Sequence, residues 1–261
     1  MNLETLDQLS LLVKSISNSV ISKRQADSYT IKPDKSWVTH TDLEIENRLK
    51  EYLLKDFPES EFIGEESHTG EELGSGLNWI LDPVDGTTNY VTGLPYYATS
   101  LGLVDNGLPV AGIVYDPCRD ELFTALKGQG AWLNGRRLML PQEVFPMIHS
   151  IAMVEHKRLP QALALNLVAN QPYKSHRSFG AVALEWCWLA SGRTHLYLTG
   201  SKKLWDYSAG YLIMSEAGGY ATDLFGASYL PYDIQTRSIC AAINQATHEQ
   251  FFNLIQKHLN G

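Results

Sequence analysis

The sequence predicts a mixed α/β fold, with helices and an antiparallel sheet in its first half and alternating strands and helices in its second. Two stretches carry an apolar residue every three or four positions, up to about Lys23 and from Thr41 to Lys55, and short β-rich runs follow them. Asn106-Gly107 lies between two of these runs and suits the primed turn of a β-hairpin. Beyond Leu138 the pattern changes to strand-like and helix-like segments in turn.

The first half begins with an amphipathic helix, because leucine, valine and isoleucine recur at helical spacing from Leu3 to Ile16. Residues 27–38 are rich in turn-forming residues and are expected to form loop and turn. After the second helix, short apolar runs bounded by glycine or acidic residues predict strands. The segments expected to hold strands are 61–67, 77–82, the hairpin 98–116 and the glycine-containing stretch 120–135.

In the second half, glycines mark the expected ends of two helices, at Gly192 and Gly218. Strands are expected at 150–154, 195–200 and 237–243, and helices at 160–170, 180–192, 204–219 and 247–259. No repeat or flexible linker separates the halves. We therefore expect one domain over 1–261 made of two intimate halves, about 1–143 and 144–261, with the seam near 138–149.

Composition narrows the class of protein. The chain has 21 basic and 29 acidic side chains and a net charge of −8, which argues against direct binding of nucleic acid through its overall field. Its N-terminus lacks the features of a signal peptide, and no apolar run is long enough to cross a bilayer. The three cysteines have no metal or redox spacing, so we expect buried thiols and a cytoplasmic protein with no membrane partner.

Acidic residues follow two expected strands and begin a later helix. Glu66 comes after one strand, Asp82 and Asp85 come after the next, and Asp206 lies at the start of the helix 204–219. If the two strands end at the same sheet edge, these carboxylates meet, and an all-oxygen set selects Mg²⁺ over Zn²⁺. Each motif alone also has an ordinary interpretation, such as an Asx turn for Asp82 to Asp85 or a helix N-cap for Asp206.

The motifs together resemble the inositol monophosphatase family of Mg²⁺-dependent, lithium-sensitive phosphatases. The resemblance rests on "WILDPVDGTTNYVTGLP" at 79–95 and "LWDYSAGYLIMSEAGG" at 204–219, with "YDPCRDELFTALKGQGAWLNG" at 115–135 between them. Upstream, "KPDKSWVTHTD" and "GEES" also fit, so the similarity spans about residues 32–225. It implies an α-β-α-β-α layered sandwich, two or three Mg²⁺ ions, sensitivity to lithium and a homodimer.

The resemblance also implies roles for individual residues in holding metal. Glu66, Asp82 and the carbonyl of Val84 would hold a first Mg²⁺, and Asp82, Asp85 and Asp206 a second. Glu66 would also reach a third, weaker ion through water.

A second group of implied roles concerns phosphate and water. The backbone N–H groups of Gly86 and Thr87 would bind phosphate at a helix start, which glycine permits by allowing close backbone approach. Asp42 would pair with the Thr87 hydroxyl and orient the attacking water. Glu66, Asp42 and Thr87 are the candidate catalytic residues.

The match departs from the family in the substrate loop. Inositol-specific members carry a glutamate about seven residues before the aspartate of the second signature, and Thr199 stands there in this chain. Lys202 and Lys203 follow it and would favour a second anionic group, unless both are surface side chains. Lys32 also matches nucleotide-directed members, and Gly180 and Ala181 are further candidates for substrate contact.

The predicted function is Mg²⁺-dependent hydrolysis of a small phosphorylated metabolite, with inositol 1-phosphate or a similar sugar or polyol monophosphate first. A 3′(2′),5′-bisphosphate nucleotidase or a fructose-1,6-bisphosphatase activity is the alternative. An alternative of another class is a non-catalytic partner of a transcription complex.

Overall fold

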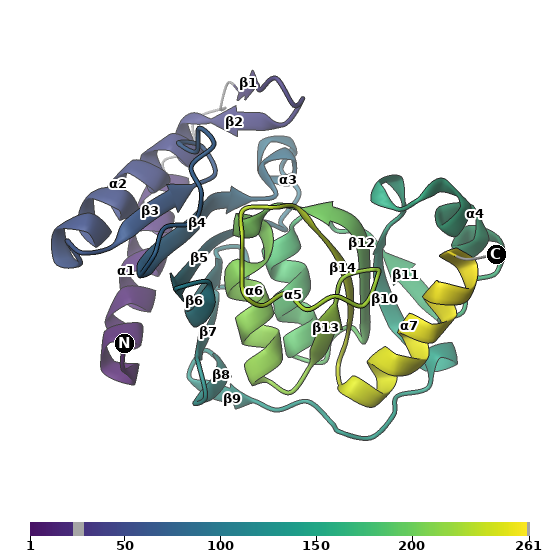
Figure 1. Ribbon diagram of the computed structural model, residues 1–261. Helices are drawn as coiled ribbons and strands as arrows, with labels where there is room; N and C mark the ends of the chain where they lie inside the picture. The colour runs from purple at the N-terminus through teal and green to yellow at the C-terminus, as the bar shows by residue number, and fades with distance from the viewer. Residues whose placement is uncertain (23–28, 260–261) are drawn as a thin grey trace.

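Two β-sheets alternate with three layers of helices in the computed structural model, which describes residues 1–22 and 29–259 (Figure 1). One outer layer is α1 (Leu3–Ile21) with α2 (His40–Asp56), and the other is α4 (Gln161–Ala169) with α7 (Gln245–Leu259). Between the sheets lie α5 (Val182–Ala190) and α6 (Leu204–Glu216). The predicted α-β-α-β-α arrangement is confirmed. The expected end of the first helix at Lys23 lies outside the described residues.

The first sheet has seven strands in the order β3-β4-β5-β6-β7-β8-β9. Its first two strands are parallel and all later neighbours are antiparallel. The expected hairpin joins β5 to β6, with Asn106 and Gly107 both at positive φ, as a primed turn requires. The strands are β3 (Glu61–Gly64), β4 (Leu77–Asp85), β5 (Ala98–Asp105), β6 (Leu108–Asp116), β7 (Glu121–Leu126), β8 (Gly130–Leu133) and β9 (Arg136–Leu138).

The second sheet has five strands in the order β11-β10-β12-β14-β13. Strand β10 is parallel to both of its neighbours, while β14 runs antiparallel to β12 and β13. The strands are β10 (Ile151–Glu155), β11 (Ser175–Arg177), β12 (Leu196–Lys202), β13 (Tyr220–Thr222) and β14 (Arg237–Ala242). The 3₁₀ turns η1 (Met147–His149) and η2 (His156–Arg158) flank β10, and η2 continues directly from its end.

Three hydrophobic cores correspond to the spaces between layers. One lies under α1 and α2, one surrounds α5 and α6 between the sheets, and one lies under α4 and α7. The central helices approach the first sheet closely, because a Cβ on Gly112 of β6 would lie 2.7 Å from the backbone carbonyl oxygen of Ala209 on α6. This close approach places the start of α6 beside the end of β4.

Some local expectations were wrong. Residues 29–39 form a short antiparallel hairpin, β1 (Tyr29–Ile31) with β2 (Trp37–Thr39), where loop was expected; residues 27 and 28 of that segment lie outside the described residues. The stacking of Tyr29 on Trp37, with ring centroids 4.0 Å apart, contributes to its pairing. Cys118 is exposed where a buried thiol was expected. The short helix α3 (Thr87–Thr92), by contrast, begins where the resemblance implied a helix start.

The chain passes from the first sheet to the second between β9 and β10, and the division into halves near residue 143 stays a prediction. Among the described helices, none combines the length and the apolar character that crossing a membrane requires.

Candidate metal centre

The end of β4 brings two carboxylates to one side of the strand through an irregularity in pairing. Asp82 pairs with Ser100 of β5 and Asp85 with Ala98, so three steps along β4 match two steps along β5. In a regular strand, residues three apart point to opposite faces. The extra residue of this β-bulge turns Asp85 to the side of Asp82. The spacing of the two carboxylates is therefore a consequence of the bulge.

Asp206 joins these carboxylates from the other half of the chain. It lies in the first turn of α6, where its Oδ2 accepts a hydrogen bond from the Lys203 N–H at 2.8 Å. One carboxylate oxygen from each of Asp82, Asp85 and Asp206 lies within 4.8 Å of the others. The structure thus brings together three of the four carboxylates that the sequence predicted to meet.

Because the three carboxylates are buried close together, ionisation of each one is less favourable than in water. Burial raises the pKa of Asp82 and of Asp85 well above the usual range, and nearby carboxylates add to the effect. Burial also raises the pKa of Asp206 to about 6, against the opposing effect of Lys202. Asp82 Oδ1 is buried with no hydrogen-bond partner among the described residues. An unpartnered oxygen within an all-carboxylate group fits a hard divalent cation such as Mg²⁺.

The start of α5 fixes the orientation of Asp85. The Val182 N–H donates to its Oδ1 at 3.0 Å and the Ala183 N–H to its Oδ2 at 2.6 Å. These N–H groups lack partners within the helix, so a carboxylate satisfies them. Ala181, a predicted substrate contact, is fully buried, and a Cβ on Gly86 would lie 2.9 Å from its Cβ. Ala181 therefore packs against the β4 end, while Gly180 beside it is exposed.

Next to the acidic group lies a hydroxyl–carboxylate pair. The Thr87 hydroxyl lies 3.2 Å from Asp42 Oδ1 and 3.0 Å from the Val84 carbonyl oxygen. Asp42 is held in turn by the capping box of α2, in which its Oδ2 accepts hydrogen bonds from the Thr39 N–H and hydroxyl. Burial raises the pKa of Asp42 to about 6. The contact that the resemblance implied is present in the structure.

The structure does not bring Glu66 into the acidic group. Both of its carboxylate oxygens lie 2.8 Å from Lys32 Nζ, and its side chain is only 4% exposed. Burial, followed by the neighbouring charge of Glu65, raises the pKa of Glu66 to about 7. Glu65, the preceding residue, lines a hollow together with Asp206 and also contacts Lys32 Nζ at 3.0 Å. The metal-holding role that the resemblance implied for Glu66 stays a prediction, and Glu65 is the alternative that this arrangement offers.

Once the structure shows which face of β3 is covered, the period of the strand distinguishes the two glutamates. Ile63 and Ile80 both pack in the core between the sheets, where α6 lies. Continuing the alternation by two residues places Glu65 on the face of Ile63 and Asp82 on the face of Ile80. The Glu65 N–H also donates to the Leu81 carbonyl, which keeps the two strand ends level.

A hollow of about 460 Å³ opens beside this group, and we call it the metal-side hollow. Glu65 and Asp206 line it together with Lys203, whose Nζ lies 3.4 Å from Asp34 and over the ring of Trp205. Lys32, through its contact with both glutamates, lies at its edge. Lys35 also lines it, as do two cations that sequence reasoning missed, Lys157 and Arg158.

Lys202 forms an ion pair within the protein and does not line the metal-side hollow, so its predicted contact with substrate stays a prediction. Lys202 is buried, and its Nζ lies 2.7 Å from Glu155 Oε2 on the adjacent strand β10. Thr199 is fully buried and donates to the same oxygen at 3.0 Å. A second bulge explains this convergence, because Thr199 pairs with Ile239 and Lys202 with Arg237, three steps against two.

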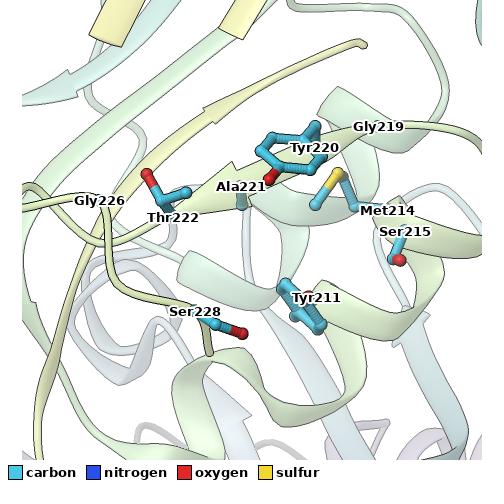
Figure 2. A pocket seen from close by; sticks show the side chains of 9 residues that line it. All are labelled: Tyr211, Met214, Ser215, Gly219, Tyr220, Ala221, Thr222, Gly226 and Ser228. Carbon is cyan, nitrogen blue, oxygen red and sulfur yellow. The ribbon is translucent and has the colours of Figure 1, made fainter. Parts of the chain in front are cut away.

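A different hollow, of about 220 Å³, lies between α6 and β13 (Figure 2). Figure 2 shows the side chains of Tyr211 and Met214 from the helix and of Tyr220 and Thr222 from the strand around it. Hydroxyl, aromatic and thioether groups line it, without a charged side chain. It therefore has neither the acidic group nor the cations of the metal-side hollow.

Comparisons with known proteins agree with this geometry. Residues 4–260 match the model of the "Inositol monophosphatase family". The chain is 38% identical to inositol monophosphatase 1 of Solanum lycopersicum, over 84% of this chain and 82% of that protein. It is 36% identical to Nus factor SuhB of Pasteurella multocida, over 77% of each chain. It is 35% identical to fructose-1,6-bisphosphatase/inositol-1-monophosphatase of Aquifex aeolicus, over 87% and 85%.

Solved structures share the fold. The structure of staphylococcal IMPase-I complexed with products superposes with a TM-score of 0.86 at 24% identity, covering 97% of this chain and 96% of that one. An IMPase/NADP phosphatase complexed with Mg²⁺ and phosphate gives a TM-score of 0.84 at 25% identity, covering 96% and 95%. The chain thus belongs to the inositol monophosphatase family of Mg²⁺-dependent phosphatases, and it is a phosphoric monoester hydrolase.

Proposed function

We propose that this phosphatase hydrolyses a small phosphorylated polyol or sugar, with inositol 1-phosphate as the first candidate. The observation that carries the proposal is the group formed by Asp82, Asp85 and Asp206 beside the Thr87–Asp42 pair and the metal-side hollow. Buried carboxylates that repel one another are stabilised when they bind cations. Cations bound there would in turn attract the negative charge of a phosphate ester.

In this proposal Asp82, Asp85 and Asp206 hold Mg²⁺, joined by Glu65 and the Val84 carbonyl. Glu65 takes the role first expected of Glu66, because it lines the metal-side hollow with Asp206 while Glu66 is paired with Lys32. Bound Mg²⁺ stabilises the negative charge that develops on the phosphoryl oxygens and on the leaving alcohol. The number of ions, two or three, is part of the proposal.

Asp42 and Thr87 orient the attacking water. The Thr87 hydroxyl has acceptors on two sides, Asp42 Oδ1 and the Val84 carbonyl oxygen. Its lone pairs are then free to accept a hydrogen from water, which directs the water oxygen toward phosphorus. Asp42 is itself held by Thr39, so the pair is oriented before substrate binds.

Gly86 and Thr87 provide the phosphate cradle of the proposal. Gly86 has a φ of 91°, a left-handed conformation that glycine adopts without strain, and it begins α3. The N–H groups at the start of this helix are available for phosphate oxygens. Asn89 stabilises the turn by donating to the Tyr96 and Phe179 carbonyl oxygens.

The choice of substrate in this proposal is supported in part by the names of relatives. The names of the relatives from Solanum lycopersicum and Aquifex aeolicus include inositol monophosphatase, and the second also includes fructose-1,6-bisphosphatase. We measure phosphate release from inositol 1-phosphate, fructose 1,6-bisphosphate, 3′-phosphoadenosine 5′-phosphate and histidinol phosphate, with and without Mg²⁺. Mg²⁺-dependent turnover of inositol 1-phosphate is expected. Absence of Mg²⁺-dependent turnover on the whole panel contradicts the proposal.

A second candidate function follows from the relative named Nus factor SuhB, which is 36% identical. It is a role in a transcription complex through protein contacts. A strain that lacks this chain and receives Asp82→Asn separates the two functions. Full rescue of the deletion phenotype by the variant supports the binding role, and failure to rescue with a normally expressed variant supports catalysis.

Lithium sensitivity, a homodimer and a cytoplasmic location complete the proposal. Li⁺ is expected to inhibit turnover in an uncompetitive-like manner, and excess Mg²⁺ is expected to inhibit by trapping product. Light scattering at micromolar concentration tests the dimer, which a monomer mass contradicts.

A further inference from the structure

A second open hollow adjoins the metal-side hollow at the end of β10. It has a volume of about 470 Å³ and lies between η2 and β11, and we call it the basic hollow. Lys157 lines both hollows, so a molecule that occupies the first can extend into the second. The β10 strand and η2 form one continuous segment, which fixes the position of the shared wall.

Positive charge is in excess around Glu155, a residue that lines the basic hollow. Lys157, Arg158 and Lys202 all converge on the single carboxylate of Glu155, at 3.2, 3.3 and 2.7 Å. Burial alone would raise the pKa of Glu155, but Lys202 and the other donors lower it to about 2. Three cations on one anion leave two positive charges uncompensated, in a chain whose net charge is −8.

Arg177 adds a further cation on the opposite wall. Its Nη1 donates to the Ser175 hydroxyl and to the His176 carbonyl oxygen at 2.7 Å, both within β11. Within residues 1–22 and 29–259, no carboxylate lies within 4.0 Å of its guanidinium. Its remaining donors are therefore available to a ligand, and guanidinium groups bind phosphate in a bidentate manner.

Two imidazoles complete the polar lining. The rings of His156 and His176 lie 5.0 Å apart, and the Nε2 atom of His156 is buried without a hydrogen-bond partner among the described residues. A buried polar atom without a partner is rare unless a water or ligand satisfies it. A neutral imidazole carries one N–H, so the unpartnered Nε2 of His156 can offer a donor to an acceptor-rich anion.

We propose that the basic hollow binds a second phosphate group of the substrate, one that is not hydrolysed. The inference rests on the proposed function, because the reacting phosphate must occupy the metal-side hollow. It deepens that function by naming a class of substrate that the site would take in addition to monophosphates, a small ester that carries two phosphates. The cations responsible are Lys157 and Arg177, which line the basic hollow, and Glu155 positions Lys157. Arg158, which also contacts Glu155, lines the adjoining metal-side hollow. Lys202 and Thr199, expected to contact substrate, act instead by holding Glu155.

The test compares two classes of ester on the same protein. We measure kcat/KM with Mg²⁺ for inositol 1-phosphate and for fructose 1,6-bisphosphate and 3′-phosphoadenosine 5′-phosphate. The variant combines Lys157→Gln with Arg177→Gln. The matched control combines Lys127→Gln with Arg136→Gln, which removes one exposed lysine and one exposed arginine near β7 and β9.

At least one doubly phosphorylated ester is expected to lose about tenfold to a hundredfold more kcat/KM than the monophosphate in the first variant. The control is expected to change the two classes equally. Equal losses on both classes in the Lys157→Gln, Arg177→Gln protein overturn the subsite, while the monophosphate turnover of the unaltered protein leaves the proposed function standing.

Calorimetry without Mg²⁺ gives a readout that needs no turnover. Fructose 1,6-bisphosphate is expected to bind the unaltered protein more tightly than fructose 6-phosphate, and the first variant is expected to lose that difference. Equal binding of the two sugars by the unaltered protein overturns the subsite, even if hydrolysis of inositol 1-phosphate is normal. Selective binding without hydrolysis of any ester supports the subsite and contradicts the proposed function.

Discussion

The ends of β4 and β12 share one irregularity and differ in charge. In each strand a bulge sets three residues against two on the antiparallel neighbour, so that side chains three apart face the same side. At the end of β4 the two side chains are Asp82 and Asp85. At the end of β12 they are Thr199 and Lys202, which both contact Glu155.

The two ends differ in whether like or opposite charges meet there. The β4 end gathers like charges and leaves Asp82 Oδ1 without a partner, so the pKa values of its carboxyls are raised. The β12 end gathers opposite charges, so the pKa of Glu155 is lowered. Raised pKa values indicate a site that needs a cation from outside, and lowered values indicate one that stabilises the fold.

Asp82→Asn is expected to have the largest effect and to separate activity from stability. Losing one metal ligand removes several kcal/mol of transition-state stabilisation, so kcat/KM should fall about a hundredfold to a thousandfold. The metal-free protein should melt at a higher temperature, because one of three repelling carboxylates is gone. Phosphate release and thermal unfolding with and without Mg²⁺ measure both effects.

The control for this prediction is Asp7→Asn, an exposed aspartate on α1. It should leave activity and the Mg²⁺-induced rise in melting temperature unchanged. If Asp82→Asn instead destabilises the metal-free protein, the β4 end resembles the β12 end and the contrast between them fails.

A comparison of Glu65→Gln with Glu66→Gln tests which of the two glutamates contributes to the metal centre at the end of β4. Glu65 lines the metal-side hollow with Asp206, so its substitution should lower kcat/KM about tenfold to a hundredfold and raise the Mg²⁺ concentration needed for half-maximal rate. Glu66→Gln should change kcat/KM by no more than about threefold, since it alters only the pair with Lys32. The reverse ranking restores Glu66 as the metal ligand.

Glu155→Gln tests the β12 end through the pH dependence of the free energy of unfolding. The pKa of Glu155 is about 2 in the folded protein and ordinarily near 4.5, so its charge stabilises the fold above pH 4.5. That contribution, roughly 1–3 kcal/mol for this partly exposed network, is lost as pH falls from 4.5 toward 2. Urea unfolding should show Glu155→Gln less stable at pH 7 and nearly equal to the unaltered protein near pH 2. A constant difference at both pH values contradicts this account.

Thr199→Val should have the smallest effect, about 1 kcal/mol of unfolding free energy, because it removes one hydrogen bond to Glu155 and keeps the volume. Thr199→Glu should cost more, since a second carboxylate would be buried beside Glu155. Equilibrium unfolding at pH 7 ranks the two. A Thr199→Glu protein as stable as the Thr199→Val protein would show that the position opens to solvent and to substrate.

Most carboxylates of the metal centre could be predicted from the sequence because short continuous segments indicate them. Asp82 and Asp85 follow a strand and Gly86 follows them, and the hairpin at Asn106 and Gly107 needs only the turn preference of two residues. Such features depend on neighbours within a few positions. The layer order and the family likewise follow from motifs that each occupy one continuous segment.

Only the tertiary structure decided which glutamate faces the metal centre and what Lys202 does. Glu65 and Glu66 are adjacent and chemically identical, and the choice depends on which face of β3 the start of α6 covers. Lys202 is directed to Glu155 because a bulge and a parallel neighbour set it there, 47 residues from its partner in the chain (202 minus 155). Whether a charged side chain stabilises the fold or is available to a ligand depends on which distant strand lies beside it. No local segment of the sequence specifies that strand pairing.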